Sequence, residues 1–435
     1  MTVEIVDTLV IGGGQAGVAM SEHLRMRDVP HLVVERGRIA ERWRSERWDS
    51  LVANGPAWHD RFPNKTFDKT QPDGFASKEE ITAYFEAYAQ QIEMPLRCGV
   101  EVLNLSRASE GEGFDAKTDA GVIRARNVVV ATGPFQKPMF PALIPQTPDL
   151  LQIHSNGYKN PGQLPKGGVL VIGAGSSGVQ IADELRRSGR SVWLSVGPHD
   201  RPPRHYRGKD FVWWLGVLGL WDMKTPGPGT EHVTIAVSGA QGGHTVDFRT
   251  LAESGITLTG RTLSANAHEL TFASDLQKNI EAGDANYLAM LNAADAYVRT
   301  HGLDLPEEPQ AHLIGSLPDC VTSPLTSLNL AEAGIGSIIW ATGYGYDFSW
   351  LDLDVLDERG APRHEDGVSI EPGLYFLGLP WLTRRASPFI WGVWHDAARL
   401  AGHIAPDKAG GDVLRAPLSE QMTDGSSPKG PLMNV

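Results

Sequence analysis

Two glycine-rich segments of this sequence have the spacing that cradles the pyrophosphate of a dinucleotide. Residues 12–17 read GGGQAG and residues 173–178 read GAGSSG, so each matches the pattern GxGxxG. The first glycine of this pattern permits a tight turn, the second lets the backbone approach the phosphates, and the third lets a helix pack on a strand. Free N–H groups and the dipole at the start of that helix favour negative charge. The spacing therefore predicts two dinucleotide sites in one chain.

An acidic residue accompanies the first glycine segment. An apolar run over residues 7–12 leads into it, a helical pattern follows it, and Glu35 ends the next apolar run. A carboxylate there accepts hydrogen bonds from the ribose hydroxyls of an adenine dinucleotide. We expect FAD at this segment. The residues predicted to bind it are Gly12, Gly14, Gln15, Ala16, Gly17, Glu35, Arg36, Trp43, Ala131, Thr132 and Gly133.

The second glycine segment lacks such an acid. The next apolar run ends at Ser195 and continues into Arg201 and Arg204. An acid would repel a 2′-phosphate and arginines would attract one, so NADPH is favoured over NADH. Alternatively, these arginines form a solvated face or pair with nearby acids. The residues predicted to bind NADPH are Gly173, Gly175, Ser176, Ser177, Gly178, Ser195, Arg201, Arg204, Ala341, Thr342 and Gly343, of which the last three could lie on the FAD side.

Two such sites in one chain imply that hydride passes from a nicotinamide to the isoalloxazine ring of a flavin. The only cysteines, Cys98 and Cys320, stand far apart in the sequence. Neither a dithiol redox centre nor a metal site is therefore predicted. Oxygen or a quinone remains as the acceptor of the electrons.

The overall charge bears on the partners. A formal net charge of −13 would be repelled by nucleic acids and anionic membranes. No apolar segment reaches the roughly 20 residues of a membrane span. We expect a protein of the reducing cytoplasm whose partners are a small-molecule substrate and O2, with a homodimer as the base-rate expectation.

The elements that must position these residues are two strand–turn–helix–strand units. The fold class they predict is α/β, with two Rossmann-like domains and the NADPH-binding domain inserted into the FAD-binding domain. A strand-like run at 337–343 is taken as the start of the return to the FAD domain. The predicted domains are residues 1–160 (FAD, first part), 161–330 (NADPH, with an aromatic insertion at about 205–225), 331–405 (FAD, return) and 406–435 (a flexible tail).

Shorter motifs accompany the glycine segments: ERW at 41–43, RWDSL at 47–51, ATG at 131–133, ATGY at 341–344 and GLYFLG at 373–378. With them the chain resembles the flavin-containing monooxygenase superfamily (class B flavoprotein monooxygenases), particularly its bacterial CzcO-like branch. The linking fingerprint of that superfamily, FxGxxxHxxx(F/Y), is degenerate here. His154 and Tyr158 match it, whereas Pro148 and Leu150 replace its phenylalanine and glycine. The resemblance therefore does not decide between N-oxygenation, Baeyer–Villiger oxidation and other oxygenations.

The resemblance implies an active-site role for Asn54. Its amide would lie beside the flavin and hydrogen-bond NADP or a flavin peroxide. The local alternative is an Asn-Gly turn at Asn54 and Gly55. The implied reaction is that of an FAD- and NADPH-dependent monooxygenase, in which a C4a-(hydro)peroxyflavin oxygenates a small substrate by N- or S-oxidation or hydroxylation. Two alternatives stay open: an NAD(P)H-flavin oxidase or quinone reductase without oxygen insertion, and a flavoprotein redox sensor or regulator.

Such chemistry requires a dry pocket, and aromatic residues are available to line one. The residues predicted as its wall or lid are Phe211, Trp213, Trp214 and Trp391. The alternative for the cluster that begins at Phe211 is the buried stripe of an ordinary helix.

Overall fold

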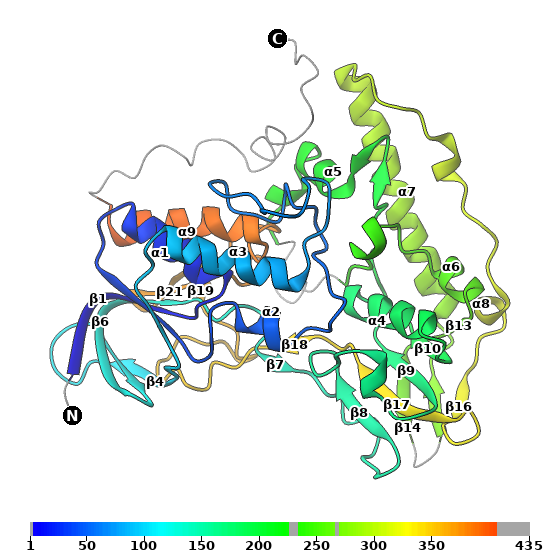
Figure 1. The fold of residues 1–435 in the computed structure, drawn as a ribbon, viewed down its shortest axis with the longest axis horizontal. Helices are drawn as coiled ribbons and strands as arrows, with labels where there is room; N and C mark the ends of the chain where they lie inside the picture. The colour runs from blue at the N-terminus through cyan, green and yellow to red at the C-terminus, as the bar shows by residue number, and fades with distance from the viewer. Residues whose placement is uncertain (1–2, 226–233, 266–268, 407–435) are drawn as a thin grey trace.

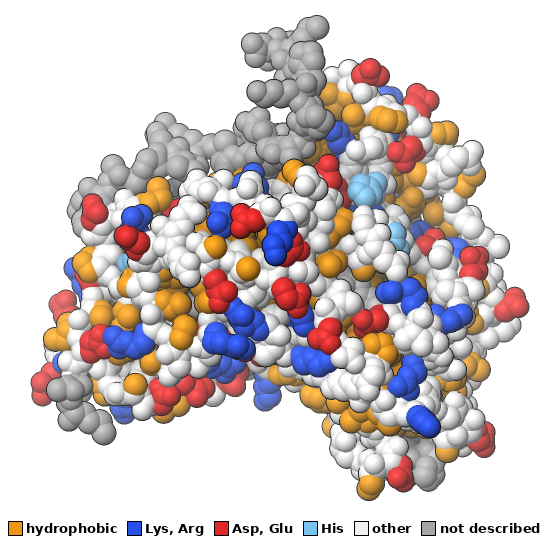
Figure 2. All heavy atoms as spheres, viewed as in Figure 1, with side chains coloured by type: hydrophobic (Ala, Val, Ile, Leu, Met, Phe, Trp, Pro, Cys, Tyr) orange, Lys and Arg blue, Asp and Glu red, His pale blue; other side chains and the backbone are white. Residues whose placement is uncertain are grey.

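The protein folds into two lobes that lie side by side (Figure 1). The computed structural model describes residues 3–225, 234–265 and 269–406, so the tail predicted beyond residue 406 lies outside the described residues. Figure 2 shows a recess between the lobes along the lower edge of the view, with acidic and basic side chains interspersed on this face. Each lobe is built around parallel strands, which confirms the predicted α/β fold with two dinucleotide-binding units.

The first lobe contains a nine-stranded sheet in the order β19-β20-β21-β6-β1-β2-β3, to which β5 and β4 are attached beside β6. Its central strands β21, β6, β1, β2 and β3 run parallel. Parallel pairing places the carboxyl ends of β1 and β2 at one edge, where ligands bind in such sheets. The strands are β1 (Val3–Ile11), β2 (His31–Glu35), β3 (Leu96–Cys98), β4 (Val102–Arg107), β5 (Phe114–Thr118), β6 (Gly121–Val130), β19 (His364–Glu365), β20 (Val368–Ser369) and β21 (Leu374–Phe376).

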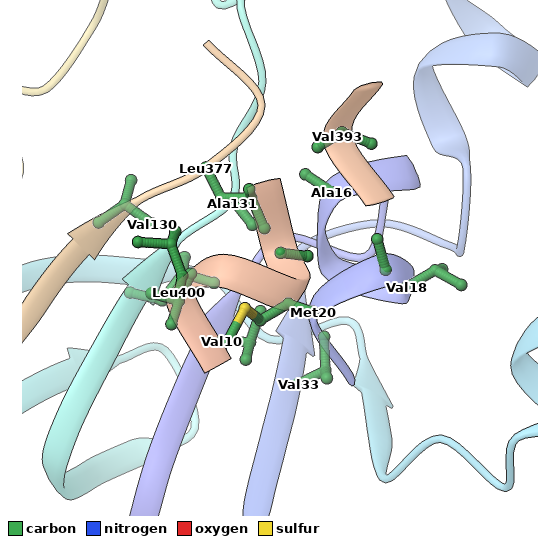
Figure 3. Close-up of a cluster of buried hydrophobic side chains, with 14 of the residues drawn as sticks. Val10, Ala16, Val18, Met20, Val33, Val130, Ala131, Leu377, Val393 and Leu400 are labelled. Carbon is green, nitrogen blue, oxygen red and sulfur yellow. The ribbon is translucent and has the colours of Figure 1, made fainter. Parts of the chain in front are cut away.

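Helices from both ends of the described chain cover this sheet. The helices of the lobe are α1 (Gln15–Arg25), α2 (Glu41–Ser45), α3 (Lys78–Gln91) and α9 (Ile390–Ile404). Figure 3 shows how Val10 and Val33 of the sheet meet Met20 of α1 and Leu400 of α9. All four side chains are fully buried or nearly so, and their burial holds the last helix against the first strand.

The second lobe contains a five-stranded parallel sheet in the order β13-β10-β9-β17-β8. Its strands are β8 (Leu151–His154), β9 (Gly168–Ile172), β10 (Val192–Ser195), β13 (Ile256–Thr259) and β17 (Ile335–Trp340). Its helices are α4 (Ser176–Arg187), α6 (Phe248–Glu253), α7 (Leu276–His301) and α8 (Asp319–Thr322). A small antiparallel sheet adds β14 (Thr262–Ala265), β15 (Glu269–Phe272) and β16 (Ser327–Asn329).

This second sheet corrects both predicted domain boundaries. β8 precedes residue 161 and β17 follows residue 330, yet β17 pairs with β9 on one side and β8 on the other. The prediction that the run at 337–343 returns to the first lobe is therefore wrong, because this strand is central to the second sheet. A fully buried parallel strand is apolar along its whole length, so its sequence does not reveal to which of two similar sheets it belongs.

Two stretches of chain cross between the lobes side by side. β7 (Lys137–Pro138) on the outgoing stretch pairs antiparallel with β18 (Tyr344–Gly345) on the returning one (Figure 1). The aromatic insertion follows the second glycine unit and consists of a short hairpin, a helix and a 3-10 turn. These elements are β11 (His205–Tyr206), β12 (Lys209–Asp210), α5 (Phe211–Val217) and η2 (Leu220–Asp222); further 3-10 turns are η1 (Pro161–Gln163), η3 (Ala240–Gly242) and η4 (Pro309–His312).

Candidate functional site

The first glycine turn connects β1 to α1 and leaves open space at its middle glycine. Gly12 has a φ of +117°, and a Cβ on it would lie 2.5 Å from the Ala131 carbonyl oxygen. A Cβ on Gly17 would lie 1.9 Å from the Gly12 oxygen, whereas a Cβ on Gly14 would have no atom within 4 Å. Gly12 and Gly17 are thus required by packing, and Gly14 leaves the room that a pyrophosphate needs. The turn fits a dinucleotide.

Glu35 stands at the end of β2 with its carboxylate held in place. Its two oxygens accept hydrogen bonds from the backbone N–H groups of Gly13 (2.7 Å) and Gly37 (2.8 Å). This position beside the turn is the one expected for a partner of ribose hydroxyls. Gln15 donates from Nε2 to the Pro388 carbonyl oxygen (2.7 Å), which ties the turn to the segment before α9. Ala16 is buried against that helix.

The remaining residues predicted for FAD lie around this edge with differing exposure. The Thr132 hydroxyl and the Gly133 carbonyl both accept hydrogen bonds from Gln136 Nε2, at 3.1 and 2.8 Å. Arg36 is exposed and lies 3.9 Å from Glu101. Trp43 is partly buried and packs against the cores of both lobes, so it lies at their junction.

The second glycine turn repeats this construction between β9 and α4. Gly173 has a φ of +109°, and a Cβ on it would lie 2.4 Å from the Ala341 carbonyl oxygen. A Cβ on Gly178 would lie 1.8 Å from the Gly173 oxygen. Ala341 therefore supports the second turn as Ala131 supports the first, which places residues 341–343 beside the second turn. At Gly175, a Cβ would meet Thr234 Cγ2 at 3.3 Å.

Two further residues of this turn were predicted for the nicotinamide cofactor. Ser176 donates from its hydroxyl to the Ile235 carbonyl oxygen (2.8 Å), so the segment that begins at Thr234 runs across the turn. Ser177 is half-buried at the start of α4. The Thr342 hydroxyl bonds the Met139 carbonyl on the crossing stretch.

The arginines predicted for a 2′-phosphate are buried ion-pair partners instead. Arg201 is 2% exposed and lies 2.9 Å from Asp284; Arg204 is 1% exposed and is paired with Asp210. Neither guanidinium is open to a cofactor phosphate, so this prediction is wrong and its alternative, pairing with nearby acids, is correct. The acids lie far along the chain or on the next strand, where an unaligned sequence does not reveal them.

Sequence reasoning missed Arg261, which lies two residues after the end of β13. Its side chain is 57% exposed and lies beside Gly197, since a Cβ on that glycine would be 3.4 Å from Arg261 Cγ. Its Nε bonds Asp275 at 2.6 Å. Ser195, which ends β10, is buried and donates to the Gly260 carbonyl oxygen at 2.9 Å. The position shortly after a strand of the second sheet was the available signal.

Asn54 lies where the two lobes meet. Its side-chain oxygen accepts a hydrogen bond from Gln180 Nε2 on α4 (2.9 Å), and its backbone carbonyl accepts one from Arg204 (2.6 Å). Among the described residues, Asn54 Nδ2 has no hydrogen-bond partner. The chain bends at Asn54 and Gly55, and the Gly55 N–H donates to the Asp60 side chain at 3.0 Å, but neither residue has the positive φ typical of an Asn-Gly hairpin turn.

An aromatic cluster borders this junction. Phe211 and Trp391 belong to it together with Trp58 and Trp221, and Trp213 packs against it. Trp214 does not: it is fully buried among residues of the hairpin and α7 and donates to the Tyr206 carbonyl oxygen. For Trp214 the alternative of an ordinary core residue is therefore correct.

Several buried polar atoms near this cluster have no partner in the part of the chain that the structure describes. They include His59 Nε2 and Trp391 Nε1. His59 is 2% exposed, its Nδ1 bonds Asp60 at 2.6 Å, and its ring stacks on Trp221. With Nδ1–H donated to that carboxylate, Nε2 of the neutral ring is an acceptor, while the indole N–H is a donor. Buried polar atoms normally have partners, so a bound water or ligand group would satisfy each of these atoms.

A bacterial relative matches nearly the whole chain. The sequence is 36% identical over 404 residues to an uncharacterized CzcO-like oxidoreductase of Geobacillus kaustophilus, covering 92% of this chain and 98% of the relative. The chain belongs to the CzcO-like oxidoreductases. Its resemblance to the flavin monooxygenase superfamily is thereby confirmed.

This CzcO-like chain is also similar to monooxygenases. A probable indole-3-pyruvate monooxygenase of Arabidopsis thaliana is 33% identical over 405 residues, covering 91% of this chain and 89% of the relative. A flavin-containing monooxygenase of Stenotrophomonas maltophilia has the same fold, with a TM-score of 0.64 and 18% identity over 93% of this chain and 100% of that one. Residues 9–211 match the family described as pyridine nucleotide-disulphide oxidoreductase.

These comparisons confirm that this CzcO-like chain is an oxidoreductase. Its two cysteines stand in different lobes, Cys98 exposed on β3 and Cys320 half-buried in α8. They do not form the dithiol that a disulphide reductase needs. No helix within the described residues is long and apolar enough to cross a membrane.

Proposed function

We propose that this oxidoreductase is an NADPH-dependent flavin monooxygenase that oxygenates a small organic substrate at nitrogen, at sulfur or by hydroxylation of carbon. Bound FAD would supply the chemistry: reduced by NADPH, it would activate O2 so that one oxygen atom enters the substrate and the other leaves as water. The observation that carries the proposal is the unpartnered Nδ2 of Asn54 at the junction of the lobes. A fixed N–H donor there would stabilise negative charge without titrating.

Each cofactor has a proposed turn. FAD would bind at the first, with its pyrophosphate over Gly14 and a ribose on Glu35, because that turn has open space and a positioned carboxylate. NADPH would bind at the second, with its pyrophosphate over Gly175. The nicotinamide and the isoalloxazine ring would then meet between the lobes, beside Asn54.

Arg261 is the proposed partner of the NADPH 2′-phosphate. Its guanidinium is solvent-exposed at the carboxyl edge of the second sheet, next to the loop after β10 where the adenosine ribose is expected. Asp275 holds this guanidinium in place, and a planar guanidinium has donors left to bind a phosphate as well.

The aromatic cluster would serve the substrate. Its tryptophans exclude water from the reacting centre, which preserves the activated oxygen. His59 Nε2 and Trp391 Nε1 would offer an acceptor and a donor to polar groups of the substrate. Of the predicted lid residues, Phe211, Trp213 and Trp391 keep this proposed role.

Stopped-flow absorbance tests the proposed function. NADPH-reduced protein is mixed with oxygenated buffer, and the flavin spectrum is followed between its reduced and oxidised forms. A transient band that decays faster with substrate supports a monooxygenase. Direct reoxidation with stoichiometric hydrogen peroxide, with or without candidate substrates, would establish an oxidase. Negligible NADPH consumption with every acceptor would indicate a redox sensor.

A further inference from the structure

We infer that Gln180, on helix α4 of the second lobe, is the positioning residue that fixes the direction of the Asn54 amide. This inference rests on the proposed function, since it explains why Asn54 presents a donor to the junction. Gln180 is 7% exposed, and its Nε2 lies 2.9 Å from Asn54 Oδ1 and 2.9 Å from the Val237 carbonyl oxygen. The three groups form one chain of hydrogen bonds.

The chemistry of these groups admits one orientation. A backbone carbonyl only accepts, so the Gln180 atom that faces Val237 must be the nitrogen. That nitrogen uses its second hydrogen toward Asn54, which must therefore present its oxygen. Asn54 Nδ2 then points away from α4. The assignment of both amides follows from the Val237 carbonyl, because it is the one group of these three whose donor and acceptor atoms cannot be exchanged.

The backbone of Asn54 is restrained separately, which leaves the amide rotation as its remaining freedom. Arg204 donates to the Asn54 carbonyl, and its guanidinium lies over the rings of Phe75 (4.9 Å) and Phe211 (4.5 Å). Next to it, a Cβ on Gly239 would lie only 2.1 Å from the Ala53 carbonyl oxygen, so the two lobes touch closely here. With the backbone fixed, Gln180 determines whether the Asn54 amide directs its nitrogen or its oxygen toward the junction of the lobes.

A variant that accepts instead of donating should reverse this choice. In Gln180→Glu the ionised side chain can only accept, so it loses its bond to the Val237 carbonyl and takes one from Asn54 Nδ2, and the turned Asn54 amide presents its oxygen to the junction. Gln180→Met has a similar length and removes the hydrogen bonds without reversing them. Gln277→Glu is the matched control, because Gln277 is exposed on α7 and, within the described residues, its side chain bonds only Glu281.

Two measurements test the inference, and the first needs no bound cofactor. In thermal unfolding of the flavin-free chain, Gln180→Met and Asn54→Ala should each lower the midpoint, and the double variant should lower it by less than the sum. Additive shifts would overturn the hydrogen-bonded arrangement. Gln277→Glu should leave the midpoint nearly unchanged.

The second measurement separates positioning from mere stability. In stopped flow, Gln180→Glu should shorten the lifetime of the transient flavin band by up to about 100- to 1000-fold, the loss expected for a preorganised donor, and Gln180→Met should have a smaller effect. Flavin reduction by NADPH should stay within about twofold, and Asn54→Ala should abolish the difference between the two Gln180 variants. Equal decay in Gln180→Glu and the unsubstituted protein would overturn the inference.

The two proposals fail in different ways. If the unsubstituted protein shows no transient band, the proposed function fails, and the same single variants, with the Gln180 variants also combined with Asn54→Ala, are then compared by the rate of direct flavin reoxidation. Gln180→Glu should still change that rate only when Asn54 is present. A rate that responds to Gln180 in the absence of Asn54 would overturn the positioning role by itself.

Discussion

Gly14→Ala should separate cofactor binding from folding within one motif. Gly14 has a φ of −85° and a ψ of −169°, a conformation that alanine adopts without strain, and the added methyl would have no protein atom within 4 Å. The unfolding free energy of the flavin-free protein should therefore change by less than about 1 kcal/mol. The methyl would occupy the space proposed for the FAD pyrophosphate and push it from the helix N-terminus.

The expected loss of FAD affinity in Gly14→Ala can be estimated from the hydrogen bonds that the pyrophosphate would lose. A hydrogen bond to a charged group contributes about 1.5–3 kcal/mol, so losing one should weaken FAD binding roughly 10- to 150-fold. Titration of flavin-free protein with FAD measures this loss, and the ratio of flavin to protein absorbance after gel filtration checks it. Gly12→Ala is the contrasting variant, because its Cβ would lie 2.5 Å from the Ala131 oxygen and should impair folding. An unchanged FAD affinity in Gly14→Ala would refute the assignment of FAD to this turn.

Further predictions concern the second site and acid stability. Gly175→Ala should keep FAD but raise the KM for NADPH in steady-state reduction, since its methyl meets Thr234 at 3.3 Å; an unchanged KM would contradict the NADPH assignment. Arg261→Ala should raise the KM for NADPH at least about tenfold and leave that for NADH nearly unchanged, by loss of a charge-assisted contact. Burial lowers the pKa of His23 and of His395 to about 3, so the unfolded chain binds more protons below about pH 6.5. Stability should be full above that pH and fall toward pH 3, by at most about 1.4 kcal/mol per pH unit for each histidine. Unfolding midpoints between pH 7 and pH 4 measure the slope, which should be shallower in His395→Gln.

Local patterns were enough to predict both glycine turns. The turn at residues 12–17 and the turn at residues 173–178 depend on neighbours within the same strand–turn–helix unit, so their roles can be read from spacing. Glu35 likewise ends the strand next to its own turn. The flanking ATG motifs were recognised as a pair, but the sheet to which the second belongs was not.

Long-range partners explain the errors. Arg201 finds Asp284 on α7, more than eighty residues further along the chain. Its neighbour Arg204 is drawn inward by Asp210 and by the Asn54 carbonyl of the other lobe. The sequence of a basic segment does not show whether its arginines bind a phosphate or a buried acid, because their partners depend on which acids the fold brings close to them.

The two sites are not independent in this fold. The segment from Thr234 to Val237 touches the second glycine turn at one end, through Thr234 Cγ2 and the bond from Ser176 to Ile235. At its other end the Val237 carbonyl orients Gln180, which in turn holds Asn54. A nucleotide bound over Gly175, as proposed, would lie beside this segment and would act on the same backbone that directs the Asn54 amide. NADPH, which reduces the flavin, would thus influence the Asn54 amide that stabilises the oxygenated flavin. The influence would pass through Thr234, Ile235 and Val237 and through the side chain of Gln180.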